Sequence, residues 1–145
     1  MTEPPTFDDA IGFVRKHPEM FFSPHRSRSL SCAIHLVTEA LALGGSDVRV
    51  FQAGPWWVVL STTDWFGSVA THDMFHRIIS FPRLGANSMQ IEVVLRAFAE
   101  SVATYNAAHG FELIVGDAPD ESVKRSMTSS ARAVAFAGTL ALDPP

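Results

Sequence analysis

Cysteine is almost absent from the sequence, which has a single one, Cys32, among 145 residues. One cysteine cannot form a disulfide within the chain, as expected for a protein of the reducing cytoplasm. Long apolar runs are also missing: runs such as 56–60 fall far short of the roughly 18 residues that a membrane span needs. The N-terminus has acids and prolines where a secretory signal has basic and then apolar residues. We therefore expect a soluble, cytoplasmic protein that does not enter a membrane.

An excess of positive charge is lacking as well. The chain has 11 basic and 15 acidic residues and a formal net charge of -4, so broad attraction to nucleic acid is not expected. Apolar residues make up 47% of the sequence and include 11 phenylalanines, which is enough to build a hydrophobic core. The length fits a single domain over 1–145, with residues 1–6 as a flexible polar tail.

The clearest helix signal lies between residues 29 and 43. Apolar residues recur there at spacings of four, three and four, and two glycines follow: Leu30, Ile34, Val37 and Leu41 form the stripe. Further helices are expected over 7–17, over 72–79 and over 87–110, where Asn87 is a good N-cap for a long apolar stripe. The lone Cys32 lies within the helix expected over 29–43, and we interpret it as a small core residue.

Strand signals flank these helices. The segments 47–52 and 56–62 are rich in β-branched and aromatic residues and enclose Gly54 and Pro55, which predicts a hairpin. The adjacent Trp56 and Trp57 should then point to opposite faces of the sheet. Three more strands are expected as a meander over 111–116, 122–129 and 133–142. This order predicts an α+β fold, a two-layer sandwich in which helices cover one face of an antiparallel-rich mixed sheet.

Several strings in the sequence occur together in one known family. Residues 14–21 are VRKHPEMF, residues 39–44 are EALALG before a strand, a Val-Val pair at 93–94 begins a helix, and Gly-Thr at 138–139 precedes Asp-Pro. In this order the strings resemble the gyrase B-type ATPase domain of the GHKL (histidine kinase/Hsp90-like) superfamily, over about residues 7–144. The resemblance implies a Bergerat-like fold and an ancestral ATP site.

The resemblance also implies where catalytic residues would lie. In the family, a glutamate on the long helix activates water, and an asparagine four residues later holds Mg²⁺. Alignment of the helix ends puts Ser31 and His35 at these positions, whereas the other register puts Glu39 and Leu43 there. Neither register keeps the pair, and neither histidine nor leucine suits Mg²⁺, which prefers oxygen ligands.

The remaining family elements are only partly present. The adenine-binding turn corresponds to 64–67, where Trp65 and Phe66 place bulk on what should be open backbone. Only Gly85 remains of the glycine-rich lid, and Thr139 matches a threonine on the family's late strand. The residues of this degenerate nucleotide pocket would be Ser31, His35, Glu39, Asp64, Gly67, Gly85 and Thr139.

These departures predict a pseudo-ATPase that serves as a protein-binding or regulatory module, with no cofactor, no catalytic residue and no bound metal. Its partner would be another protein or, as in the family, a second copy of the chain. The alternative is a nucleotide-binding or ATP-hydrolysing enzyme that uses ATP and Mg²⁺ in a shifted site made by Glu39, Asp64 and Thr139. His72 and His76 have the spacing of two metal ligands, but we expect an exposed helix end there.

Overall fold

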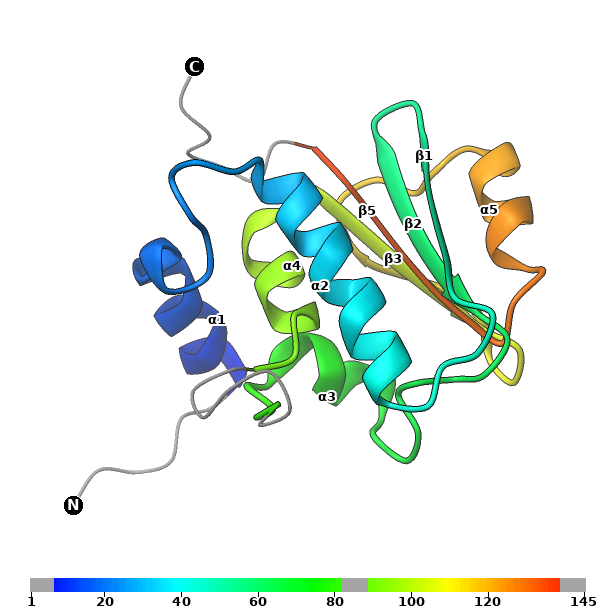
Figure 1. Cartoon of the computed structure of the whole chain (residues 1–145), viewed down its shortest axis with the longest axis horizontal. Helices are drawn as coiled ribbons and strands as arrows, with labels where there is room; N and C mark the ends of the chain where they lie inside the picture. Colours follow the sequence, from blue (N-terminus) through cyan, green and yellow to red (C-terminus); the bar gives the residue numbers. More distant parts are fainter. Residues whose placement is uncertain (1–6, 82–88, 139–145) are drawn as a thin grey trace.

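A computed structural model of the chain describes residues 7–81 and 89–138 (Figure 1). Its helices are α1 (Phe7–Lys16), α2 (Arg28–Ala42), α3 (Thr71–His76), α4 (Glu92–Phe98) and α5 (Glu121–Met127), with a short 3-10 helix at Pro18–Met20. Its strands are β1 (Arg49–Ala53), β2 (Trp56–Ser61), β3 (Ser101–Asn106), β4 (Gly110–Val115) and β5 (Arg132–Ala137). The fold is α+β, as expected, and none of the described helices is long and apolar enough to cross a membrane.

The described strands form one open sheet in the order β1-β2-β5-β3-β4. The predicted hairpin is confirmed as β1 and β2, and its turn contains Gly54 with a φ of 58°, a conformation that glycine adopts without strain. Every neighbouring pair of described strands is antiparallel, so the expectation of a mixed sheet is wrong for them. The reason is that β5 enters between β2 and β3 and runs antiparallel to both.

The long helix expected over 87–110 is in fact two elements. Helix α4 ends at Phe98, and strand β3 begins at Ser101. The apolar stripe was misleading because Val102 and Tyr105 continue a helical spacing and also suit a strand. In β3 they lie on opposite faces of the sheet, with Val102 in one hydrophobic cluster and Tyr105 against the other.

The expected meander also contains a helix in place of its middle strand. Residues 121–127 form α5, and the carboxylate of Asp120 caps it by accepting a hydrogen bond from the Val123 N–H at 3.0 Å. The outer two segments are confirmed as the strands β4 and β5, but β3 lies between them in the sheet, so the expected meander is wrong for the described strands. Asp120 suits both a helix N-cap and a turn between strands, so the sequence alone does not distinguish the two.

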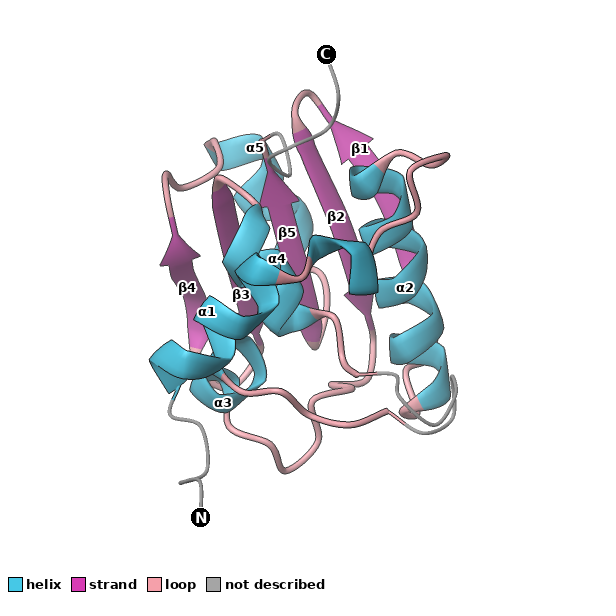
Figure 2. Cartoon of the chain, turned by 90° about the vertical axis from the view of Figure 1, so that its left-hand side faces the viewer, coloured by secondary structure: helices cyan, strands magenta, loops and turns pink. Residues whose placement is uncertain are grey.

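Helices cover both faces of the sheet, which corrects the expectation that they cover one. In Figure 1, α2 and α4 lie on one side of the strands and α5 lies on the other. Figure 2 shows the larger helical layer in front of the sheet. On this side Val134 and Phe136 of β5 pack into the larger core. The three alanines that alternate with them belong to the cluster of Val123 and Met127 of α5 on the other side: Ala133, Ala135 and Ala137. Small residues in β5 thus leave room for a helix on the second face.

Helix α2 does not bury the stripe that predicted it. Its buried residues are Cys32, Ala33, Leu36, Glu39 and Ala40, so Cys32 is a core residue as expected. The predicted stripe lies on the neighbouring flank, where three of its members are exposed: Leu30 at 41%, Ile34 at 46% and Leu41 at 57%. Helix α2 therefore has two apolar faces, and the sheet covers only one of them.

Candidate functional site

The predicted pocket residues lie on α2 and in the loop that follows β2. The described members are Ser31, His35 and Glu39 on α2 and Asp64 and Gly67 in the loop. Gly85 and Thr139 lie outside the described residues. The described members do not form one pocket, because Glu39 belongs to a buried pair of carboxyl groups and Asp64 to a separate ion pair.

Glu39 lies in the core beside a second carboxyl group, that of Glu92 on α4. Both residues are 0% exposed. The Oε1 atom of Glu39 accepts a hydrogen bond from the Ile91 N–H at 2.9 Å, and the Oε2 atom of Glu92 accepts one from the Trp65 indole N–H at 3.2 Å. Because Ile91 and Glu92 begin α4, the pair joins α2, α4 and the loop after β2.

The electrostatics of this pair favour protonated carboxyl groups. Burial raises the pKa of Glu39 well above its usual value, and the charge of Glu92 raises it further. Burial also raises the pKa of Glu92, while the hydrogen bonds from Glu39 and Trp65 oppose that rise. Glu39 therefore has the stronger tendency of the two to keep its proton. The Oε2 atom of Glu39 and the Oε1 atom of Glu92 are buried without a hydrogen-bond partner among the described residues.

The other two predicted residues of α2 take part in no such network. His35 is half-buried and stacks on Phe81 with the ring centroids 6.5 Å apart. Burial lowers its pKa, against a hydrogen bond with the backbone of Met89. Its Nε2 atom is buried and has no hydrogen-bond partner in the described part of the chain. Ser31 is half-buried one turn earlier. Among the described residues, no hydrogen bond joins Ser31, His35 and Glu39 to one another.

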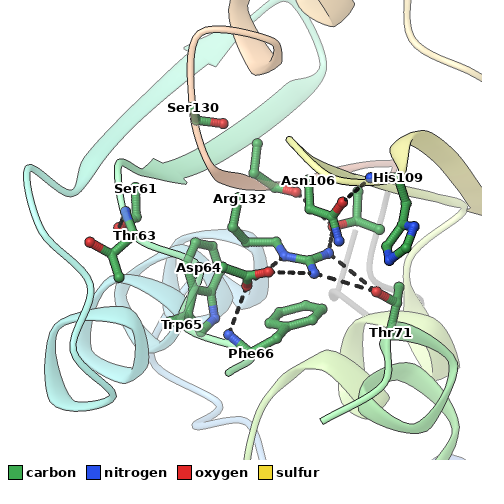
Figure 3. Close-up of polar contacts among 12 residues, drawn as sticks. Ser61, Thr63, Asp64, Trp65, Phe66, Thr71, Asn106, His109, Ser130 and Arg132 are labelled. Atoms are coloured by element: carbon green, nitrogen blue, oxygen red, sulfur yellow. Dashed lines mark hydrogen bonds and ion pairs between the residues drawn. The ribbon is translucent and has the colours of Figure 1, made fainter. Parts of the chain in front are cut away.

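Asp64 is fully engaged by Arg132, the first residue of β5 (Figure 3). The two Asp64 carboxylate oxygens each lie 2.9 Å from a nitrogen of the guanidinium, and Oδ1 also accepts a hydrogen bond from the Phe66 N–H at 2.9 Å. The Arg132 side chain is only 3% exposed. Its Nη1 atom also donates to the Thr104 hydroxyl at 3.1 Å, and its guanidinium lies 3.8 Å from the Phe66 ring centroid.

The aromatic residues of this loop fill the core. Trp65 is 2% exposed and Phe66 is 3% exposed, and their rings meet edge to face with centroids 5.7 Å apart. Gly67 has a φ of 60°, and its N–H donates to the carbonyl of Asp64 at 3.2 Å, so the glycine is explained by the turn itself. The loop is anchored by Asp64, Trp65 and Phe66 and is not an open cradle for a ligand.

Sequence reasoning missed Arg132 and Glu92, the two residues that complete these clusters. The one signal for Arg132 was that it begins β5 and is the only charged residue in that otherwise apolar strand. For Glu92, the signal was an acid at the first position of a helix that otherwise packs into the core. Both partners lie far along the chain, so no local pattern joined them to Asp64 or Trp65.

The histidines of α3 do not form part of a metal site among the described residues. The rings of His72 and His76 stack with centroids 4.1 Å apart, and His76 Nδ1 lies 2.9 Å from the carbonyl oxygen of His72. No cluster of three or more potential metal ligands occurs in the described part of the chain. The geometry of α3 thus matches a helix end.

The described surface carries an apolar groove between the outer flank of α2 and the first two strands. Its volume is about 220 Å³, and we call it the α2–β1 groove; it is lined by Leu30, Ala33, Ile34, Val37, Thr38, Val50 and Trp57. None of these lining residues carries a charge. A second, more polar cleft of about 420 Å³ adjoins it at Trp57 and reaches Ser27 and Ser29 at the start of α2.

Comparison of the chain with protein-family models, with curated proteins and with solved structures gives no match.

Proposed function

We propose that the chain is a non-catalytic protein-binding module and that the α2–β1 groove is its binding surface. The observation that carries this proposal is the exposure of Leu30, Ile34 and Leu41 on a helix flank beside Val50, which is 45% exposed on the edge strand. Contiguous exposed apolar surface of this kind marks interaction sites in soluble proteins. Isolated apolar residues would carry no such meaning, but Leu30, Ile34 and Val50 line one groove, and Leu41 continues the apolar stripe of α2.

The state of the predicted nucleotide pocket supports a non-catalytic role. Asp64 is held by Arg132 and by the Phe66 N–H, and Glu39 is buried with its carboxyl held by the backbone of Ile91. The alternative, an enzyme that uses Mg-ATP, would require these groups to leave an ion pair and a packed core. A base that activates water must also reach the reacting atoms, and Glu39 is 0% exposed.

The relation to the GHKL superfamily stays a prediction. If the chain derives from such a domain, the pseudo-ATPase proposal explains why its strings persist without the water-activating and metal-binding pair. The assignment of the groove does not depend on that ancestry, because it is argued from exposure and chemistry alone.

Site-specific cross-linking tests the binding surface. A photoreactive amino acid at Ile34 lies in the groove, whereas the same amino acid at Leu113, 41% exposed on β4, lies at the other edge of the sheet. We expect a protein adduct in the native cell from position 34 and none from position 113. No adduct at position 34, or equal adducts at both positions, would contradict the proposal.

Thermal melting with and without Mg-ATP tests the alternative. A nucleotide at 100 times its dissociation constant adds about 2.7 kcal/mol of stability, which raises the melting temperature of a domain of this size by several degrees. We expect an unchanged melting temperature. Steady phosphate release that disappears in Glu39→Ala would establish the enzyme in place of the pseudo-ATPase.

A further inference from the structure

We propose that the protein bound at the α2–β1 groove is a second copy of this chain, related to the first by a twofold axis perpendicular to the sheet. In this arrangement α2 packs antiparallel to its copy, and the edge strand β1 lies antiparallel to its copy. The inference rests on the proposed function, which it deepens by naming the partner.

The apolar stripe of α2 is the first observation. Leu30, Ile34, Val37 and Leu41 are spaced by four, three and four residues, the spacing of a helix–helix seam. This spacing is the same in both directions along the helix. An antiparallel copy therefore matches it position by position, with Leu30 beside Leu41 of the second copy and Ile34 beside Val37 of the second copy.

The charge of α2 is the second observation. Its 15 residues include only three acidic or basic side chains, those of Arg28, His35 and Glu39, and Glu39 is buried beside Glu92. In a twofold contact the same surface patch lies on both sides, so a patch that carried charge of one sign would repel its copy. All seven residues that line the groove are uncharged, so a second copy meets no repulsion there. A strongly acidic or basic partner would find no complementary group among them.

The position of the groove at an edge of the sheet is the third observation. Among the described strands, β1 pairs with β2 alone, which leaves its other side open. Val50 and Gln52 of β1 are exposed on the side that α2 partly covers. A twofold axis perpendicular to the sheet keeps the two α2 helices on the same face, so that β1 and the α2 flank can each contact their own copy. An axis along the strands would put the two helices on opposite faces of the extended sheet. Each edge strand carries one exposed charge: Glu112 on β4, and Arg49 on β1, which is paired with Asp47 at 3.1 Å.

A pair of matched variants tests this contact in the purified full-length chain. Leu30 and Leu113 are each 41% exposed, so Leu30→Glu and Leu113→Glu make the same change at the two sheet edges. Glutamate at position 30 also suits the first turn of α2, where Ser27 is the N-cap, so the helix itself is not weakened. We expect the wild type and Leu113→Glu to form dimers by sedimentation velocity over a concentration series. Leu30→Glu should raise the dissociation constant by more than about 100-fold, because it places a carboxylate in each half of an apolar seam.

Charge exchange tests the antiparallel register. Leu41→Lys places a cation at the position expected to meet residue 30 of the second copy. We expect each single variant to be monomeric, and an equimolar mixture of Leu30→Glu and Leu41→Lys to form a heterodimer. Circular dichroism of each variant verifies that it is folded before its assembly is judged.

The outcomes separate this inference from the proposed function. A monomeric wild type at all concentrations, or a dimer weakened by Leu113→Glu and not by Leu30→Glu, overturns the second-copy inference. If cross-linking from Ile34 then joins a different protein, the proposed function stands and the inference alone fails. If position 34 gives no adduct at all, both fail.

Discussion

The substitution Glu39→Gln tests whether the buried carboxyl pair is held together by a proton. Glutamine has nearly the shape of a protonated glutamate and does not ionise. Its carbonyl oxygen can accept the hydrogen bond from the Ile91 N–H, and its amide nitrogen takes the place of the buried Oε2 atom of Glu39. The variant therefore keeps the packing and the hydrogen bond from Ile91 and removes the titration of Glu39.

The sign of the effect follows from the raised pKa of Glu39. In the unfolded chain this carboxyl titrates near its ordinary value of 4.5, and in the folded protein its pKa lies well above that value. Below pH 4.5 both states hold the proton, and its full contribution to stability is present. As the pH rises above this value, the unfolded state releases the proton first. The free energy of unfolding then falls by about 1.4 kcal/mol per pH unit until the pH passes the folded pKa.

Urea unfolding of both proteins from about pH 5 to pH 8 measures this difference. We expect Glu39→Gln to gain stability relative to the wild type as the pH rises, by up to about 1.4 kcal/mol per unit. The lowered pKa of His35 has the opposite effect on stability: the free energy of unfolding decreases as the pH falls below 6.5, the ordinary pKa of histidine. Because His35 is present in both proteins, its effect cancels when their stabilities are compared. Glu112→Gln, on the exposed part of β4, is the control for removing a surface carboxyl. A difference that stays constant with pH, or falls, would refute the reasoning.

Two further substitutions test the clusters around the loop after β2. Asp64→Ala should destabilise the protein by about 3–5 kcal/mol in urea unfolding, because it leaves the guanidinium of Arg132 buried at 3% exposure without its counter-ion. Adding Arg132→Met should recover part of that loss, and a double variant less stable than Asp64→Ala would count against this account. Trp65→Phe keeps an aromatic ring but removes the donor to Glu92, so we expect a loss of about 1–3 kcal/mol. A change below about 0.5 kcal/mol would show that this hydrogen bond is not needed.

Elements fixed by local chemistry were predictable from the sequence. The hairpin of β1 and β2 follows from two β-rich runs around Gly54, and α2 follows from its periodicity and from the glycines that end it. The boundary between α4 and β3 was not predictable in this way. Residues 101–106 become a strand because they pair with β4 and β5, which lie later in the chain. A helical spacing that continues into a strand cannot be recognised without those partners.

The candidate site was predictable only as separate positions. Asp64 and Glu39 were singled out, but their partners were not. Arg132 lies 68 residues from Asp64, and Ile91, whose N–H bonds to Glu39, lies 52 residues away. A charge in an apolar run predicts that a partner exists, since a buried charge is costly without one. It does not say which of several distant residues the partner is, and only the fold supplies that.

Helix α2 shows why burial and periodicity are different kinds of information. Its covered face holds Cys32, two alanines, Leu36 and a buried glutamate, whereas its more regular stripe of leucine, isoleucine and valine lies on the flank. A hydrophobic period predicts that a face will be covered, but the sequence does not state whether the cover comes from the same chain. Since the sheet already covers the first face, the second face is available to another molecule. The spacing of that stripe is the same in both directions along the helix, so an antiparallel copy of α2 fits it. This symmetry favours a second copy of the chain over an unrelated protein.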